Sequence, residues 1–174
     1  MKNKKITIGL FGTCGNSEWR TPFIEKYSSC GIQYFNPVKS DWKVEDATIE
    51  AEHLANDEIL LFPVTNETYA FGSLGEVGFS IMQALKLDER RDIIVMIEPD
   101  VIIDKNKSVS EFLMAEVQRK DSIKTRALVM AHLKKVKYPN VWVVDDLQKM
   151  FNISLILYDI QKMKDEAQNY TIKL

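Results

Sequence analysis

Short apolar runs alternate along the chain with longer segments in which apolar residues recur at helical spacing. The runs predict β-strands and the periodic segments predict α-helices. Strands are expected at residues 6–11, 32–35, 58–64, 92–97 and 141–144. Helices are expected at about 18–29, 45–55, after the third strand as far as Leu87, then 108–136, as one helix or two, and from Asp145 or Asp146 to about 168.

Five strand–helix units in succession are typical of an α/β protein with helices on both faces of a parallel sheet. The 174 residues suit one domain. We therefore expect residues 1–174 to form a single-domain three-layer sandwich with a five-stranded, mostly parallel sheet of flavodoxin-like or Rossmann-like type.

Composition narrows the classes of partner. The 23 basic and 25 acidic residues give a net charge of −2, so no basic field favours nucleic acid. No apolar run approaches the roughly 20 residues of a membrane span. The basic N-terminus leads into a glycine-broken run, which predicts a strand rather than a signal peptide. Two cysteines and two histidines show no metal-site spacing, so we expect no metal, no cofactor and a reducing cytoplasmic setting.

Six of the seven glycines fall in two clusters, each at the end of a predicted strand: Gly9, Gly12 and Gly15, and Gly72, Gly75 and Gly78. Glycine suits loops that need positive φ or close approach to a ligand. Because parallel strands end at one edge of the sheet, the two loops are expected to border one pocket. The first cluster has neither the dinucleotide-binding spacing nor the Lys-Ser/Thr of a phosphate-binding loop, and it could also be a plain tight turn.

Glu76 is the strongest candidate for chemistry. It is expected in the first turn of the helix after the third strand, where the helix dipole favours an ionised carboxylate that acts as base or nucleophile. The alternative is structural, because Ser73-x-x-Glu76 fits a capping box that needs no function. Spacing alone leaves both open.

Three motifs together resemble the nucleoside 2-deoxyribosyltransferase-like proteins over residues 5 to 100. They are Phe11-Gly12-Thr13-Cys14-Gly15-Asn16-Ser17-x-Trp19-Arg20, Tyr34-Phe35-Asn36-Pro37-Val38-x-x-Asp41-Trp42, and Ser73-x-x-Glu76. The resemblance implies that Glu76 attacks the anomeric carbon of a 2′-deoxynucleoside or its 5′-monophosphate. The sugar would then pass to another nucleobase or to water, making the protein a transferase or a hydrolase of nucleotide salvage.

The same resemblance implies the residues that bind substrate. The first loop would contact sugar or base, Ser73 would orient the sugar or Glu76, and the second motif would form another wall; the set is Gly12, Thr13, Cys14, Gly15, Asn16, Asn36, Asp41 and Ser73. Arg20 and the amides at the start of the helix after the third strand are candidate phosphate contacts. A neighbouring subunit completes the site in the family, which implies a homo-oligomer.

The chain departs from the family at two positions. Ala70 stands where an aspartate precedes the nucleophile, so that a carboxylate elsewhere, Glu50, Glu52 or Asp41, would have to replace it. Leu10 stands near the position of a family tyrosine. Two other functions stay open: a nucleotide-sensing module without turnover, and a phosphoribohydrolase of the lysine-decarboxylase-like type, whose Pro-Gly-Gly-x-Gly-Thr pattern is absent.

The long helical region at 108–136 independently suggests self-association. It carries apolar residues on more than one face, which is more than packing on one sheet requires: Phe112, Leu113, Val117, Leu128, Val129 and Leu133. A symmetric helix interface would bury the rest.

Overall fold

The computed structural model describes residues 6–15, 17–86, 91–102, 109–135, 138–168 and 170. Its strands are β1 (Thr7–Leu10), β2 (Gln33–Phe35), β3 (Ile59–Val64), β4 (Asp92–Ile97) and β5 (Val141–Val144). Its helices are α1 (Arg20–Ser29), α2 (Asp46–Asn56), α3 (Phe71–Lys86), α4 (Val109–Leu133) and α5 (Leu147–Gln168).

All strand pairs are parallel, and the sheet order is β2-β1-β3-β4-β5. This confirms the predicted α/β fold with a five-stranded parallel sheet. The chain moves from β1 to one side for β2 and then to the other side for β3. A crevice opens at such a reversal, outside the carboxyl ends of the strands, and ligands of open α/β proteins bind there.

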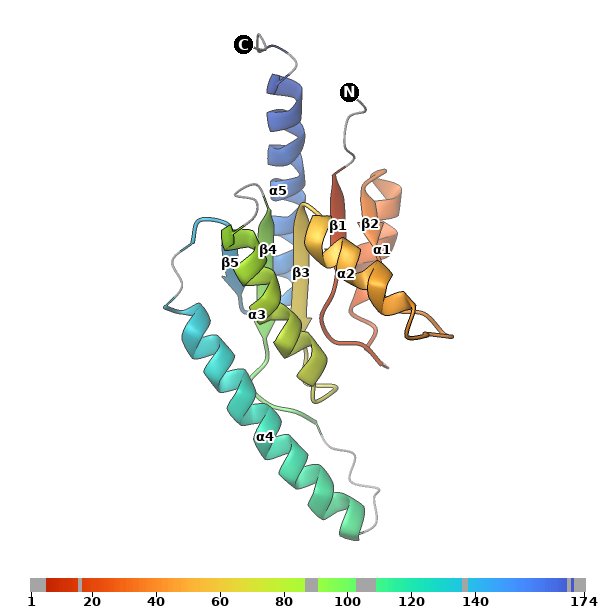
Figure 1. The fold of residues 1–174 in the computed structure, drawn as a ribbon, viewed down its shortest axis with the longest axis vertical. Coiled ribbons are helices and arrows are strands. Elements are labelled where there is room, and N and C mark those ends of the chain that lie inside the picture. The colour runs from red at the N-terminus through yellow and green to blue at the C-terminus, as the bar shows by residue number, and fades with distance from the viewer. Residues whose placement is uncertain are drawn as a thin grey trace.

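Helices cover both faces of the sheet (Figure 1). Successive side chains of a strand point to opposite faces of the sheet. Because helices cover both faces, the inner strands are apolar at nearly every position. One face packs against α1 and α5 through residues that include Leu10, Leu61, Phe23 and Met150. The other packs against α3 and the end of α4 through residues that include Phe62, Val95, Val77 and Leu133. The two layers hold the strand ends, and hence the crevice, in place.

The predicted long helical region is one helix, α4, which extends past the end of the sheet in Figure 1. The predicted ends Leu87, Ser108 and Val136 lie outside the described residues. Within the described part of the chain, no helix is both long and apolar enough to cross a membrane.

Candidate active site

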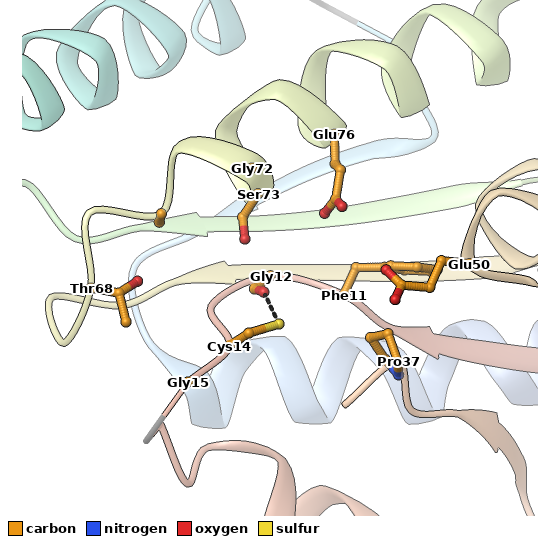
Figure 2. Close-up of a pocket in the computed structure, with 11 residues that line it drawn as sticks. Phe11, Gly12, Cys14, Gly15, Pro37, Glu50, Thr68, Gly72, Ser73 and Glu76 are labelled. Atoms are coloured by element: carbon orange, nitrogen blue, oxygen red, sulfur yellow. Dashed lines mark hydrogen bonds between the residues drawn. The ribbon is translucent and has the colours of Figure 1, made fainter. Parts of the chain in front are cut away.

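A cavity of about 320 Å³ lies at the carboxyl ends of β1 and β3, in the crevice of the sheet. Both glycine clusters reach it, through Gly12 and Gly15 on one side and Gly72 on the other (Figure 2). The described residues that line it are Phe11, Gly12, Cys14, Gly15, Pro37, Glu50, Thr68, Ala70, Gly72, Ser73 and Glu76. Its volume falls in the range of small-molecule sites.

The loop after β1 lies directly against β3. Gly12 has φ +95°, and a Cβ there would come within 2.6 Å of the Pro63 carbonyl oxygen. The Thr13 amide donates to that same oxygen at 2.9 Å, and the Thr13 hydroxyl oxygen accepts from the Thr65 amide at 2.9 Å. Only glycine fits at Gly12, and buried Thr13 joins the two loops rather than lining the cavity.

Arg20 holds the same loop from behind. Its Nε donates to Leu10 O at 2.9 Å, and its two Nη atoms donate to the carbonyls of Thr13 at 2.6 Å and Gly12 at 3.3 Å. The side chain of Arg20 is only 5% exposed. Its donors are directed at backbone carbonyls, so the geometry does not present the guanidinium as the expected phosphate contact.

Glu76 lies in the second turn of α3, because the helix begins at Phe71. The expectation that it occupies the first turn is therefore wrong. The first helical bond runs from the Leu74 amide to the carbonyl of Ala70, whose φ is +54°. Ser73 thus lies inside the helix instead of at its N-cap, and a capping box with Glu76 does not form.

Two carboxylates enter the cavity from different elements: Glu76 from α3 and Glu50 from α2 (Figure 2). Burial raises the pKa of Glu76, the negative charge of Glu50 raises it further, and Arg20 opposes both effects. The Trp42 indole Nε1 donates to Glu50 Oε1 at 2.5 Å, which fixes that carboxylate. Of the three carboxylates expected as replacements at Ala70, Glu50 is the one that lines the cavity.

The remaining candidates occupy different positions. Cys14, Gly15 and Ser73 line the cavity with Gly12. Asn36 is not in the lining, and its Oδ1 accepts from the Val38 amide at 3.1 Å. Asp41 is 84% exposed and pairs with Lys43 at 3.4 Å. Asn16 lies outside the described residues.

Cys14 is a lining thiol in contact with the Gly12 carbonyl at 3.4 Å and with an Arg20 Nη atom at 3.5 Å. Burial raises the pKa of this thiol, against the opposing effect of Arg20. The thiol is thus held neutral, which suits a wall of the cavity better than a nucleophile. Among the described residues, no group of three or more His, Cys, Asp or Glu side chains could hold a metal.

The predicted set of substrate-binding residues lacks two wall residues, Thr68 and Pro37, although Pro37 belongs to the second motif. Pro37 lies in the loop after β2 and Thr68 in the loop after β3. Their position after the carboxyl ends of these strands is the sequence feature that could have identified them. A Cβ at Gly75 or Gly78 would meet nothing within 4 Å, so close packing of α3 does not require glycine at either position. The structure gives no steric reason for glycine at these two positions.

No protein-family model and no curated protein sequence matches this chain.

Gly12→Ala is expected to destabilise the protein and close the site. The new methyl group would meet the Pro63 carbonyl in a backbone conformation that L-residues rarely adopt, so the loop must move away from β3. We expect a loss of about 2 kcal/mol or more in unfolding free energy, measured by urea denaturation. Gly31→Ala is the control, because Gly31 has φ +67° but a Cβ there would meet nothing within 4 Å. Equal losses in the two variants would show that backbone strain alone matters.

Proposed function

We propose that the protein cleaves the N-glycosidic bond of a 2′-deoxynucleoside through a covalent deoxyribosyl intermediate on Glu76. The observation that carries this proposal is the pair of carboxylates, Glu50 and Glu76, that enter one small-molecule-sized cavity from different helices. Paired carboxylates flanking the scissile bond are the usual machinery of glycoside cleavage. The resemblance of the three sequence motifs supplies the deoxyribosyl substrate.

In the first step, a Glu76 carboxylate oxygen bonds to the anomeric carbon while the bond from that carbon to the base nitrogen breaks. The electron pair of the broken bond leaves with the base, which takes up a proton. Positive charge develops on the sugar ring, and the ionised Glu76 stabilises it before trapping it. A second base or water then attacks the anomeric carbon and releases Glu76.

Glu50 and Trp42 are proposed to hold the leaving base. Glu50 lies across the cavity from α3, where its carboxyl group can hydrogen-bond to the base or pass a proton to it. Trp42 is 49% exposed, so it offers an aromatic face beside the carboxylate that it binds. This pair takes the place of the aspartate that Ala70 replaces.

An uncharged nucleoside is favoured over its 5′-monophosphate. The described lining contains two carboxylates and no lysine or arginine. Arg20, the cation that acts on Glu76 electrostatically, is committed to backbone carbonyls. A phosphate would depend on the first-turn amides of α3.

The decisive experiment is incubation with a panel of 2′-deoxynucleosides and their monophosphates, with and without a second free base. Exchange of bases identifies a transferase, and free base with free sugar identifies a hydrolase. If binding occurs without turnover of any member, the alternative of a nucleotide-sensing module is favoured.

Free thiols at Cys14 and Cys30 suit a reducing compartment. Together with a small-molecule substrate, they support a cytoplasmic role in nucleotide salvage. This proposal requires no metal or cofactor.

Glu76→Gln is expected to lower turnover by on the order of 10³ or more, because both charge stabilisation and trapping need the carboxylate. Folding should be nearly unchanged, since Glu76 makes no capping interaction in α3. Turnover and thermal melting of the variant are the measurements. A 2-fluoro-2-deoxyribosyl nucleoside should also leave its sugar mass on the peptide that contains Glu76. Normal turnover in a normally folded variant would exclude Glu76 from the mechanism.

The interaction between the Glu50 and Glu76 carboxylates should be visible in the pH dependence of kcat/KM. Glu76 must be ionised to attack, and its pKa is raised, so kcat/KM should rise with pH through that elevated pKa. Glu50→Gln removes the neighbouring negative charge and should shift this acid limb to lower pH, while reducing the rate. The pH profile of kcat/KM for both proteins tests this. An acid limb that stays in place would show that Glu50 does not act on Glu76.

We also propose a homo-oligomer assembled through α4. Leu113, Met114 and Val117 are each at least 60% exposed on this helix, with Phe112 beside them, whereas Leu133 is buried in the core. Leu113→Glu is expected to dissociate the oligomer in sedimentation at micromolar concentration, because a charge would be buried at the interface. Met163→Glu, at an equally exposed position on α5, is the control. A wild-type monomer would refute the proposal.

A further inference from the structure

The loop of residues 65–70, between β3 and the helix that carries Glu76, is held by the C-terminal half of the chain. The loop carbonyls at positions 65, 66, 68 and 69, and that of Val64 at the end of β3, all accept hydrogen bonds from residues at 98 or beyond. The Ile102 amide, for example, donates to Asn66 O at 2.8 Å. A loop has no strand partner for these groups, so its conformation depends on such donors.

Arg126 of α4 supplies most of them. Its Nη2 donates to Thr65 O at 2.9 Å and to Thr68 O at 2.7 Å. Its Nη1 donates to Glu98 O at 2.8 Å and to Val64 O at 3.3 Å. One guanidinium therefore spans both ends of the loop and the end of β4.

Ser122, one turn before Arg126, completes the arrangement. Its hydroxyl donates to Tyr69 O at 2.8 Å and its oxygen accepts from Arg126 Nε at 3.1 Å. Ser122 is fully buried and Arg126 is 1% exposed. We call these two residues the α4 clamp.

The α4 clamp is costly for packing alone. Burial lowers the pKa of Arg126, which reflects the desolvation of its charge. Among the described residues, the hydrogen-bond partners of Arg126 are neutral carbonyl and hydroxyl oxygens, and the carboxylates of Glu98 and Asp100 act on it through their charge alone. An apolar side chain would fill the same space at lower cost. What the guanidinium adds is a fixed conformation for the loop.

We propose that Arg126 is a positioning residue of the active site, acting through the loop on Glu76. The loop contributes Thr68 and Ala70 to the cavity wall, and Ala70 starts α3 in the left-handed region at φ +54°. That conformation is unfavourable for alanine and needs outside support. The clamp provides it at the adjacent Tyr69 carbonyl, and so sets the direction of α3 and of Glu76. This inference rests on the proposed function.

Ser122→Ala tests the clamp, with Ser154→Ala as the matched control. Ser154 is also fully buried and bonds another element, through the Tyr27 hydroxyl at 2.5 Å, on the opposite face of the sheet. Each variant removes a buried hydroxyl that has two hydrogen-bond partners, Tyr69 O and Arg126 Nε for Ser122 and the Tyr27 hydroxyl and Phe151 O for Ser154, so both should lose similar stability. Only Ser122→Ala should lower kcat, by about tenfold at a temperature where both proteins are folded, since misplacement of a reacting group costs rate.

Arg126→Lys is the second variant, because it keeps the charge but cannot bond four carbonyls at once. It should slow trapping by the 2-fluoro-2-deoxyribosyl nucleoside more than Ser122→Ala does. Hydrogen exchange gives a readout that does not depend on turnover. The amides at 74–77 should exchange faster in both clamp variants and at the wild-type rate in Ser154→Ala, because the Leu74 amide makes the first helical bond of α3.

The outcomes separate the two proposals. Equal kcat in Ser122→Ala and Ser154→Ala, or unchanged exchange at 74–77, would overturn the positioning role. A wild-type protein that turns over no deoxynucleoside, but shows the expected exchange in the variants, would overturn the proposed function while leaving the loop clamp in place.

Discussion

The site depends on one constraint: the carbonyl oxygens of its two irregular loops are buried without strand partners. Two buried arginines meet this need. Arg20 binds the carbonyls that follow β1, and Arg126 binds those that follow β3. A guanidinium is suited to the task because it carries five donors in a rigid plane and cannot lose its charge in a protein. The cavity walls are therefore shaped by side chains that barely reach its surface.

This arrangement also sets the electrostatics of the cavity. Arg20 lies behind the first loop, where its charge counteracts the burial and the Glu50 charge that raise the pKa of Glu76. The same side chain thus shapes the wall and favours the ionised form of Glu76, the proposed nucleophile. The hydrogen bonds of Arg20 to backbone carbonyls fix its position. Its charge therefore lies near Glu76 whether or not a ligand is bound. Preorganised charge of this kind costs no rearrangement during the reaction.

The local pattern of apolar and glycine residues was sufficient to predict the strands of the sheet and the edge at which the cavity lies. The apolar run at 92–97 matches β4, because a strand buried inside a parallel sheet must be apolar along most of its length. The run at 141–144 matches β5, an edge strand whose residues stay partly exposed. The glycine clusters indicated the crevice because each follows a strand, and parallel strands end at the same edge of the sheet. The start of α3 was misplaced because the prediction put Glu76 in the first turn, whereas the helix begins after Ala70 at positive φ, and alanine does not signal a helix start. Arg126 was missed because the carbonyls that it binds lie 28 to 62 residues away in the sequence.

The true start of α3 changes the physical account of Glu76. The helix dipole acts mainly within the first turn, and Glu76 lies beyond it. Its carboxylate therefore cannot rely on the dipole to stay ionised, and burial with Glu50 works against the charge. The opposing contribution comes from Arg20, which is held by the β1 loop. Glu76 is thus a functional candidate for a different reason than its position in the sequence suggested: it is a half-buried carboxylate facing another carboxylate, with no structural bond of its own among the described residues to explain it.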